Sequence, residues 1–330
     1  MSIGINLGLL LSAIVFGFGI VLAAGLAGHP VDGQLPSDWG KRFKEKSVPL
    51  ATLLAEQGGK VLSETTYRDS YRATLTKFLS DAQRDYGDEG FPSLSADYPY
   101  TGDRRGEQTT QRHLEEHELV RLFEGPEFAG IAADPKRERH YWLPVVGLYT
   151  GARPREICQL NPQCDWGKVG AVWYLTFDET TPAGKGVTKT IKTGETRHVP
   201  MHPELVRLGL PEYLERLKAE GADRMFPGFR VKGGNPYSAA GEEISDLLRT
   251  VGLYDNTTKG AMVTGMYVFR KTFSTYGDEQ HIDVAPFVGH RDQGKTMTQQ
   301  HYITRSKTMP WLYDQFKALH FPVTLPKRTF

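Results

Sequence analysis

The 330-residue sequence predicts a mainly α-helical fold with a small antiparallel β-sheet. Most of the chain after residue 112 repeats apolar residues at helical spacing. The run Val172–Phe177 is rich in β-branched and aromatic residues, which favour strands. Thr193-Gly194-Glu195 then forms a turn signal between two further short runs. Because the strand signals are confined to residues 172–200, helices are expected to supply most of the core.

Helical periodicity begins well before the sheet. Residues 62–86 place five apolar or aromatic side chains on one face, namely Tyr67, Tyr71, Leu75, Phe78 and Leu79. A second helix is expected from Leu114 onward, because its apolar face then continues through Leu119, Leu122 and Phe123. A third is expected over Tyr141–Tyr149.

The sheet should contain Val172–Phe177 and a hairpin whose two arms are Thr188–Ile191 and Thr196–Pro200. After the hairpin, helical patterns return in four segments, which are residues 203–220, 237–252, 264–279 and 308–319.

Composition sets limits on the function. An apolar content of 39% and a charged content of 24% suit a globular protein with a sizeable core. The net charge is only +1, whereas a dedicated DNA binder is often strongly basic, so composition alone does not predict nucleic-acid binding. Cys158 and Cys164 lack companion ligands at zinc spacing, and no acidic cluster suggests a two-metal site.

The chain is expected to divide into an apolar segment (residues 1–30), a linker with one helical pattern (residues 31–111) and a main domain (residues 112–330). Residues 3–27 exceed the roughly 20 residues that span a bilayer. No positive charge precedes this run, so it does not fit a signal peptide. Two interpretations stay open: a transmembrane helix, or a spurious apolar leader. A buried helix is disfavoured by the glycines of the run.

The first basic cluster follows the apolar run, at Lys41, Arg42, Lys44 and Lys46. By the positive-inside rule, a membrane anchor at residues 3–27 would leave the rest of the chain in the cytoplasm. The main domain is therefore expected in the cytoplasm, either free or anchored by the N-terminus.

Candidate functional residues begin at the segment Thr150–Glu156. Gly151 permits a tight turn and Pro154 suits the first position of a new helix, so Arg153 should lie at a rigid corner. The alternative is an ordinary corner with a solvated arginine.

A second candidate is Arg270, which lies between Phe269 and Phe273 on a predicted helix. Burying its charge is costly unless an anion or an acid meets it. The alternative is a structural salt bridge. Gly289-His290 follows, and Tyr302 comes twelve residues after His290.

In this order the motifs resemble those of the tyrosine recombinases, the phage-type integrases. That family has a "TGxR" arginine, a hairpin lysine, an "RxTF" arginine, a "GH" pair and a late tyrosine. The resemblance covers roughly residues 112–320, and its catalytic positions fall on Arg153, Lys192, Arg270, His290 and Tyr302.

This sequence departs from the family pattern at two places. Tyr267 stands three residues before Arg270, where the family usually has a histidine. The gap between His290 and Tyr302 is longer than usual, with extra residues around Asp292–Lys295.

The resemblance implies site-specific DNA recombination, that is, integration or excision of a mobile element. Tyr302 would attack phosphorus and form a 3′-phosphotyrosyl bond, while the two arginines stabilise the transition state. Lys192 would protonate the leaving 5′-oxygen, and His290 would bond the phosphate or assist proton transfer. Tyr267 could donate a similar bond, although a phenol is a poorer base. No metal or other cofactor is implied.

The implied partner is double-stranded DNA, bound by a homo-tetramer on two DNA sites. Four basic residues are expected to contact phosphates in the DNA cleft, namely Lys136, Arg137, Arg139 and Arg155. For each of them a solvated surface position is the alternative.

Three hypotheses for the whole chain stay open. The first is a working recombinase. The second is a DNA-binding remnant that cannot recombine, since residues 48–111 are short for the helical core-binding domain of the family. The third is a membrane-anchored protein that reuses the domain. A type IB topoisomerase shares the chemistry but has no further support. The stretch Pro310–Phe321 is apolar enough to pack on a neighbouring subunit or to close its own core.

Overall fold

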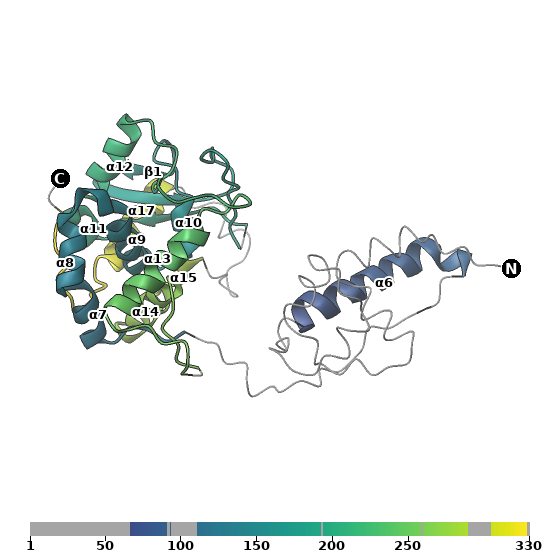
Figure 1. Cartoon of the computed structure of the whole chain (residues 1–330). Helices are drawn as coiled ribbons and strands as arrows, with labels where there is room; N and C mark the ends of the chain where they lie inside the picture. Colours follow the sequence, from purple (N-terminus) through teal and green to yellow (C-terminus); the bar gives the residue numbers. More distant parts are fainter. Residues whose placement is uncertain are drawn as a thin grey trace. The chain divides into compact units, whose positions relative to one another are not determined.

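The structure is a computed structural model that describes residues 67–90, 93, 111–192, 194–258, 260–289 and 305–328. The chain forms two units, residues 1–108 and residues 109–330. In the first unit, a π-helical turn η1 (Tyr67–Arg72) leads into α6 (Ala73–Tyr86) and a short 3-10 turn η2 (Gly87–Glu89). The helix predicted over residues 62–86 is therefore confirmed for its described part (Figure 1).

The apolar segment at residues 3–27 lies outside the described residues. Within the part of the chain that the structure describes, no helix is both long and apolar enough to cross a membrane.

The second unit is mainly helical with one three-stranded sheet, so the predicted fold class is confirmed. Before the sheet come α7 (Glu116–Phe123), α8 (Pro126–Ala133), η4 (Pro135–Arg137), α9 (Glu138–Thr150) and α10 (Pro154–Cys158). The strands are β1 (Trp166–Val169), β2 (Val172–Phe177) and β3 (Arg197–Pro200). After the sheet come α11 (Pro203–Leu208), α12 (Leu210–Ala219), α13 (Tyr237–Thr250), α14 (Tyr267–Glu279), α15 (Ala285–Val288) and α17 (Arg305–Phe316).

Helix α9 is the centre of the core. All ten of its residues from Tyr141 to Thr150 are buried, and it packs against α8, α10, α11, α13 and α14 (Figure 1). A helix that is apolar on every side is stable only when other elements surround it, as they do here. The ring of Trp142 stacks on Tyr213 of α12, with 5.3 Å between the ring centroids. Because α9 is packed on all sides, the position of its C-terminal end is fixed, and so is the start of the segment that follows.

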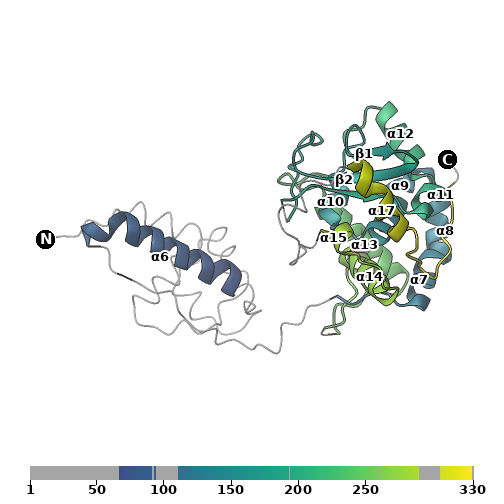
Figure 2. The ribbon, with the colours of Figure 1, turned by 180° about the vertical axis from the view of Figure 1, so that it is seen from behind.

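The sheet has the order β1-β2-β3, with both pairs antiparallel. Leu175 of β2 lies opposite Trp166 on one side and Val199 on the other. Helix α17 packs against β2 and β3, and Figure 2 shows it in yellow across the sheet. Phe316, Leu319 and Phe321 are buried in the core. The stretch Pro310–Phe321 thus closes the core of its own chain, which was one of its two predicted roles.

The predicted hairpin is wrong in one arm. Thr188–Ile191 is not a strand, and β3 pairs with β2 instead. The backbone of this segment finds other partners, because Thr188 N–H donates to Gly234 O and Thr190 N–H donates to the Gln159 side chain. The sheet also contains β1, which the sequence did not predict.

The single helix predicted over residues 203–220 is two helices. Gly209 has φ +94°, a left-handed conformation that ends α11, and Pro211 lies in the first turn of α12. The helices predicted at 237–252, 264–279 and 308–319 are confirmed as α13, α14 and α17, with ends shifted by a few residues.

Candidate functional site

Arg153 occupies a rigid corner between α9 and α10. Gly151 ends α9 with φ +57°, and a Cβ atom there would lie 2.4 Å from the Phe273 ring and 2.9 Å from Val288. Both the backbone conformation and the close packing therefore require glycine. Pro154 is the first residue of α10 and Arg153 precedes it in an extended conformation. The corner predicted from the sequence is confirmed.

Glu156 links this corner to the sheet. Its side chain accepts hydrogen bonds from the Arg153 backbone N–H at 3.0 Å and from Arg153 Nη1 at 3.1 Å. It also forms an ion pair with Arg197 of β3. Burial by itself would raise the pKa of Glu156, but the hydrogen bond and charge of Arg197, together with Arg153, hold it below its usual value. The carboxylate is thus ionised and shared by two arginines.

Arg197 is held from three directions. Its Nε donates to Phe287 O at 2.9 Å, its Nη2 pairs with Glu156, and its guanidinium carbon lies 4.5 Å from the centroid of the Phe177 ring. Its Nη1 is buried and has no hydrogen-bond partner among the described residues. A buried donor without a partner costs free energy, so an acceptor at this place would be stabilising.

Arg270 comes from α14 and reaches the same corner. Its Nη1 donates to Gly151 O at 2.6 Å, which is its one hydrogen bond within the described part of the chain. Burial lowers the pKa of Arg270 to about 10, and the positive charges of Arg153 and Arg197 contribute to the shift. The bond to Gly151 O places the guanidinium at the corner that carries Arg153.

The cluster carries more positive than negative charge. Arg153 and Arg197 pair with Glu156, and Arg270 bonds to Gly151 at the same corner. Among the described residues, three guanidinium groups thus share one carboxylate, an excess of two positive charges. Partly buried charge of one sign is unfavourable unless an anion compensates it. Guanidinium groups bind phosphate oxygens in a bidentate manner, so a phosphate group is the anion that suits this cluster best.

Tyr267 and Lys192 differ in how the structure places them relative to the arginine cluster, that is, Arg153, Arg197 and Arg270 with Glu156. Tyr267 is the first residue of α14, lies one turn before Arg270 and is 49% exposed. Lys192 lies in an exposed turn and makes no hydrogen bond or ion pair with a described residue. His290 and Tyr302 lie outside the described residues. Their predicted roles therefore stay predictions.

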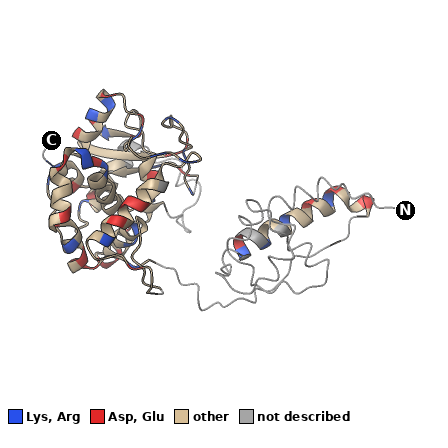
Figure 3. Cartoon of the chain, viewed as in Figure 1, with Lys and Arg blue, Asp and Glu red and all other residues tan. Residues whose placement is uncertain are grey.

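The four basic residues predicted to contact DNA differ in their surroundings. Lys136 is exposed, and Arg155 Nη2 donates to Thr188 O at 3.0 Å. Arg139 pairs with Glu243 through two contacts of 3.1 Å and lies over the Phe229 ring. Figure 3 shows acidic and basic residues interspersed along the helices of residues 109–330. Contact of these four residues with DNA stays a prediction.

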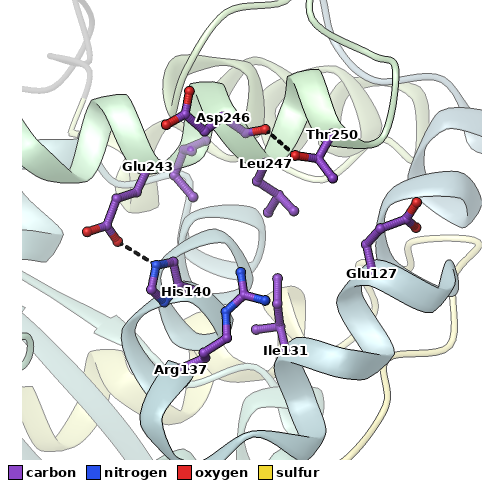
Figure 4. A pocket seen from close by; sticks show the side chains of 9 residues that line it. Glu127, Ile131, Arg137, His140, Glu243, Asp246, Leu247 and Thr250 are labelled. Atoms are coloured by element: carbon purple, nitrogen blue, oxygen red, sulfur yellow. Dashed lines mark hydrogen bonds and ion pairs between the residues drawn. The ribbon is translucent and has the colours of Figure 1, made fainter.

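Arg137 borders a pocket of about 320 Å³ that lies between α8, the start of α9 and α13. Its guanidinium points into the space beside Ile131 and His140, whereas His140 pairs with Glu243 at 2.8 Å (Figure 4). None of the arginines of the cluster lines this pocket. Among the described residues there is no group of His, Cys, Asp and Glu that could hold a metal ion.

Sequence reasoning missed two residues of the cluster. Glu156 is the third residue of α10, and an acidic residue there often reaches back to the N-cap, a signal available in the sequence. Arg197 was not predicted as a site residue. Its role depends on the pairing of β3 with β2, which brings it over Phe177, and no local pattern reveals that contact.

No protein-family model matches the sequence, and no curated protein matches it. Solved structures of recombinases and integrases are similar to the chain. XerH site-specific recombinase bound to difH substrate is 16% identical, with 91% of this chain and 74% of that chain covered and a TM-score of 0.48. The Tn1549 transposon integrase in complex with a circular intermediate DNA is 20% identical, with 86% of each chain covered and a TM-score of 0.47. A lambda integrase dimer bound to a COC′ core site is 15% identical, with 86% of this chain and 96% of that chain covered and a TM-score of 0.45. Similarity at this level assigns no activity to the chain. Any activity has to be argued from the side chains of its candidate site.

Proposed function

We propose that residues 112–330 are the catalytic domain of a site-specific DNA recombinase that cleaves and rejoins strands through Tyr302. The observation that carries this proposal is the cluster of Arg153, Arg197 and Arg270 around one carboxylate. Its excess positive charge suits a phosphodiester. The order of Arg153, Lys192, Arg270, His290 and Tyr302 along the chain adds the groups that the chemistry needs.

In the proposed reaction, Arg153 and Arg270 bind the non-bridging oxygens of the scissile phosphate. They stabilise the negative charge that grows in the pentavalent transition state. The Tyr302 hydroxyl gives up its proton, with the assistance of His290, and its oxygen forms a bond to phosphorus as the bond between phosphorus and the 5′-oxygen breaks. Lys192 gives the leaving oxygen its proton. The phosphotyrosyl bond keeps the energy of the phosphodiester, so a second 5′-hydroxyl rejoins the strand by the reverse steps.

Tyr267 lies one turn before Arg270 and donates a hydrogen bond to the same phosphate, in the place of the usual histidine. His290 is the second proposed hydrogen-bond donor to this phosphate. The partner is double-stranded DNA, with a tetramer of the chain on two sites. Lys136, Arg137, Arg139 and Arg155 bind the backbone of the duplex, which positions the DNA without reading its sequence.

Covalent capture tests this proposal. A pool of random-sequence duplexes with a nick near the centre traps the enzyme, because the short cleaved strand diffuses away and cannot be rejoined. We expect a protein–DNA adduct that survives denaturing electrophoresis, and sequencing its DNA identifies the cleavage site. Tyr302→Phe should abolish the adduct. Tyr313→Phe, on α17, removes a hydroxyl outside the proposed site and should keep it.

The DNA-binding remnant makes the opposite prediction. In that case the wild-type chain retards the duplexes in a native gel but forms no adduct. An adduct that persists in Tyr302→Phe would also overturn the assignment of the nucleophile.

A further inference from the structure

Lys189 is a buried lysine three residues before Lys192. Its side chain is 3% exposed, although the segment around it has no helix or strand. Its Nζ donates to both oxygens of Asp165 at 2.7 and 2.6 Å and to the Thr181 hydroxyl, and it lies 3.5 Å from Asp178. A buried lysine with this many partners fixes the backbone that carries it.

The partners of Lys189 are themselves fully engaged. Asp165, just before β1, also accepts from the Asn161 backbone N–H at 2.7 Å. The Thr181 hydroxyl lies 2.6 Å from both Asp165 and Asp178. Burial by itself would raise the pKa of Asp178, but hydrogen bonds from Thr181 and Thr180 and the charge of Lys189 hold it below its usual value. Breaking such a buried network leaves an uncompensated charge, which is strongly unfavourable.

A second set of contacts holds the same segment from the side of α10. The buried Gln159 side chain, directly after α10, accepts from Thr190 N–H and donates to Thr190 O, both at 3.1 Å. Helix α10 begins immediately after Arg153. The segment is therefore tied both to the sheet and to the helix that carries the first arginine.

Lys192 follows this double attachment directly. Ile191 is buried and its N–H donates to Glu179, whereas the Lys192 side chain is exposed and makes no hydrogen bond or ion pair with a described residue. The side chain of Lys192 is therefore free, while the backbone just before it is held in place. The ammonium group can contact a substrate atom, and the position of the held backbone determines which atoms it can contact.

We infer that Lys189 and Gln159 are positioning residues that hold Lys192 where it can protonate the leaving 5′-oxygen. This inference rests on the proposed function, because Lys192 has to be the proton donor. The alternative is that the buried network stabilises the fold and has no particular relation to proton transfer.

A substrate with a sulfur atom in place of the bridging 5′-oxygen separates these two readings. A thiolate leaves without a proton, so cleavage of this substrate does not need Lys192. The sulfur is placed at the cleavage site found by covalent capture, and adduct formation is followed in single turnovers for both substrates. Loss of a general acid slows the ordinary substrate by about 100-fold or more.

We expect Lys192→Ala, Lys189→Met and Gln159→Leu to cleave the ordinary substrate slowly and the sulfur substrate within a few-fold of the wild-type rate. Lys189→Arg, which keeps the charge, should retain more activity than Lys189→Met. Arg270→Ala should be slow on both substrates, because its role is on the phosphate. Gln159→Leu leaves the hydrogen bonds of Lys189 intact. If Lys189→Met does not fold, Gln159→Leu still tests whether the contacts of residues 188–191 position Lys192.

Suppose that Lys192→Ala cleaves the sulfur substrate at close to the wild-type rate, as expected for a proton donor. Two outcomes would then overturn the inference. One is that folded Lys189→Met and Gln159→Leu are slow on both substrates, which indicates a structural role. The other is that both cleave the ordinary substrate at the wild-type rate. If Lys192→Ala is not rescued, the proton-donor role of Lys192 fails and the inference fails with it.

Discussion

The Nη1 atom of Arg270 donates a 2.6 Å hydrogen bond to the backbone oxygen of Gly151, two residues before Arg153. This contact joins α14 to the corner between α9 and α10, across 119 residues of sequence. It engages one donor of the guanidinium and fixes the group at the corner that carries Arg153. The remaining donors of Arg270 are then available to an incoming anion.

Replacing Arg270 by lysine should slow adduct formation by about 100-fold, the loss typical for one donor to a developing negative charge. An ammonium group cannot keep the bond to Gly151 and also bind two phosphate oxygens in a plane. The rate is measured in single turnovers with the captured duplex. Arg249→Lys is the matched control, because Arg249 is an exposed residue of α13 that pairs with Asp246. A wild-type rate for Arg270→Lys would contradict the role of the guanidinium.

Inorganic phosphate should stabilise the folded protein. An anion that binds only the folded state adds about 2.7 kcal/mol at 100 times its dissociation constant. Thermal melting with phosphate, against sodium chloride of equal ionic strength, measures the effect. The shift in Tm should largely vanish in Arg270→Ala and persist in Arg249→Ala. Equal shifts in both variants would mean that phosphate acts on the surface in general and not at the cluster.

Removing the single carboxylate of the cluster should destabilise the fold. Glu156→Gln leaves Arg153 and Arg197 without their acid, and breaking a buried pair of this kind costs about 3–5 kcal/mol. Because the pKa of Glu156 is lowered in the folded state, its contribution is present above the usual value of 4.5 and is lost as the pH falls through the folded-state pKa. Urea unfolding at neutral pH measures the difference. Phosphate should recover part of the loss, and a variant as stable as the wild type would refute the argument.

The sequence predicted those parts of the site that local rules determine. Gly151 and Pro154 follow turn and helix-start rules, and the corner that holds Arg153 formed as expected. Thr188–Ile191 resembles a strand, yet its backbone bonds go to Gly234 and Gln159, which tertiary packing alone decides.

The arginine cluster could be predicted only in part for the same reason. Arg270 was found because a charge between two phenylalanines is unusual. Arg197 was missed because its partners, Glu156 and Phe287, are 41 and 90 residues away in the sequence. Such partners are known only once the sheet and helices have been assembled.

His202 should make the stability of the protein depend on pH. Its Nε2 donates to Leu319 O at 2.8 Å, and its Nδ1 accepts from the Glu204 N–H at 3.1 Å, so both ring nitrogens are used by the neutral form. Burial lowers the pKa of His202 to about 4, whereas the unfolded chain has the ordinary value of 6.5. Between these values the unfolded state binds the extra proton, so stability falls as the pH drops from 6.5 towards 4, by up to about 3 kcal/mol.

Urea unfolding across this pH window tests the effect of His202. His202→Gln should be less stable at neutral pH, because the bond to Leu319 is weakened, but should lose the part of the pH slope that belongs to this ring. His281→Asn is the control, since the side chain of His281 is exposed and asparagine tolerates its left-handed backbone conformation, so the slope due to His202 should be unchanged. If the slope of His202→Gln equals that of the wild type, protonation of His202 is not what opens the contact between the start of α11 and the segment after α17.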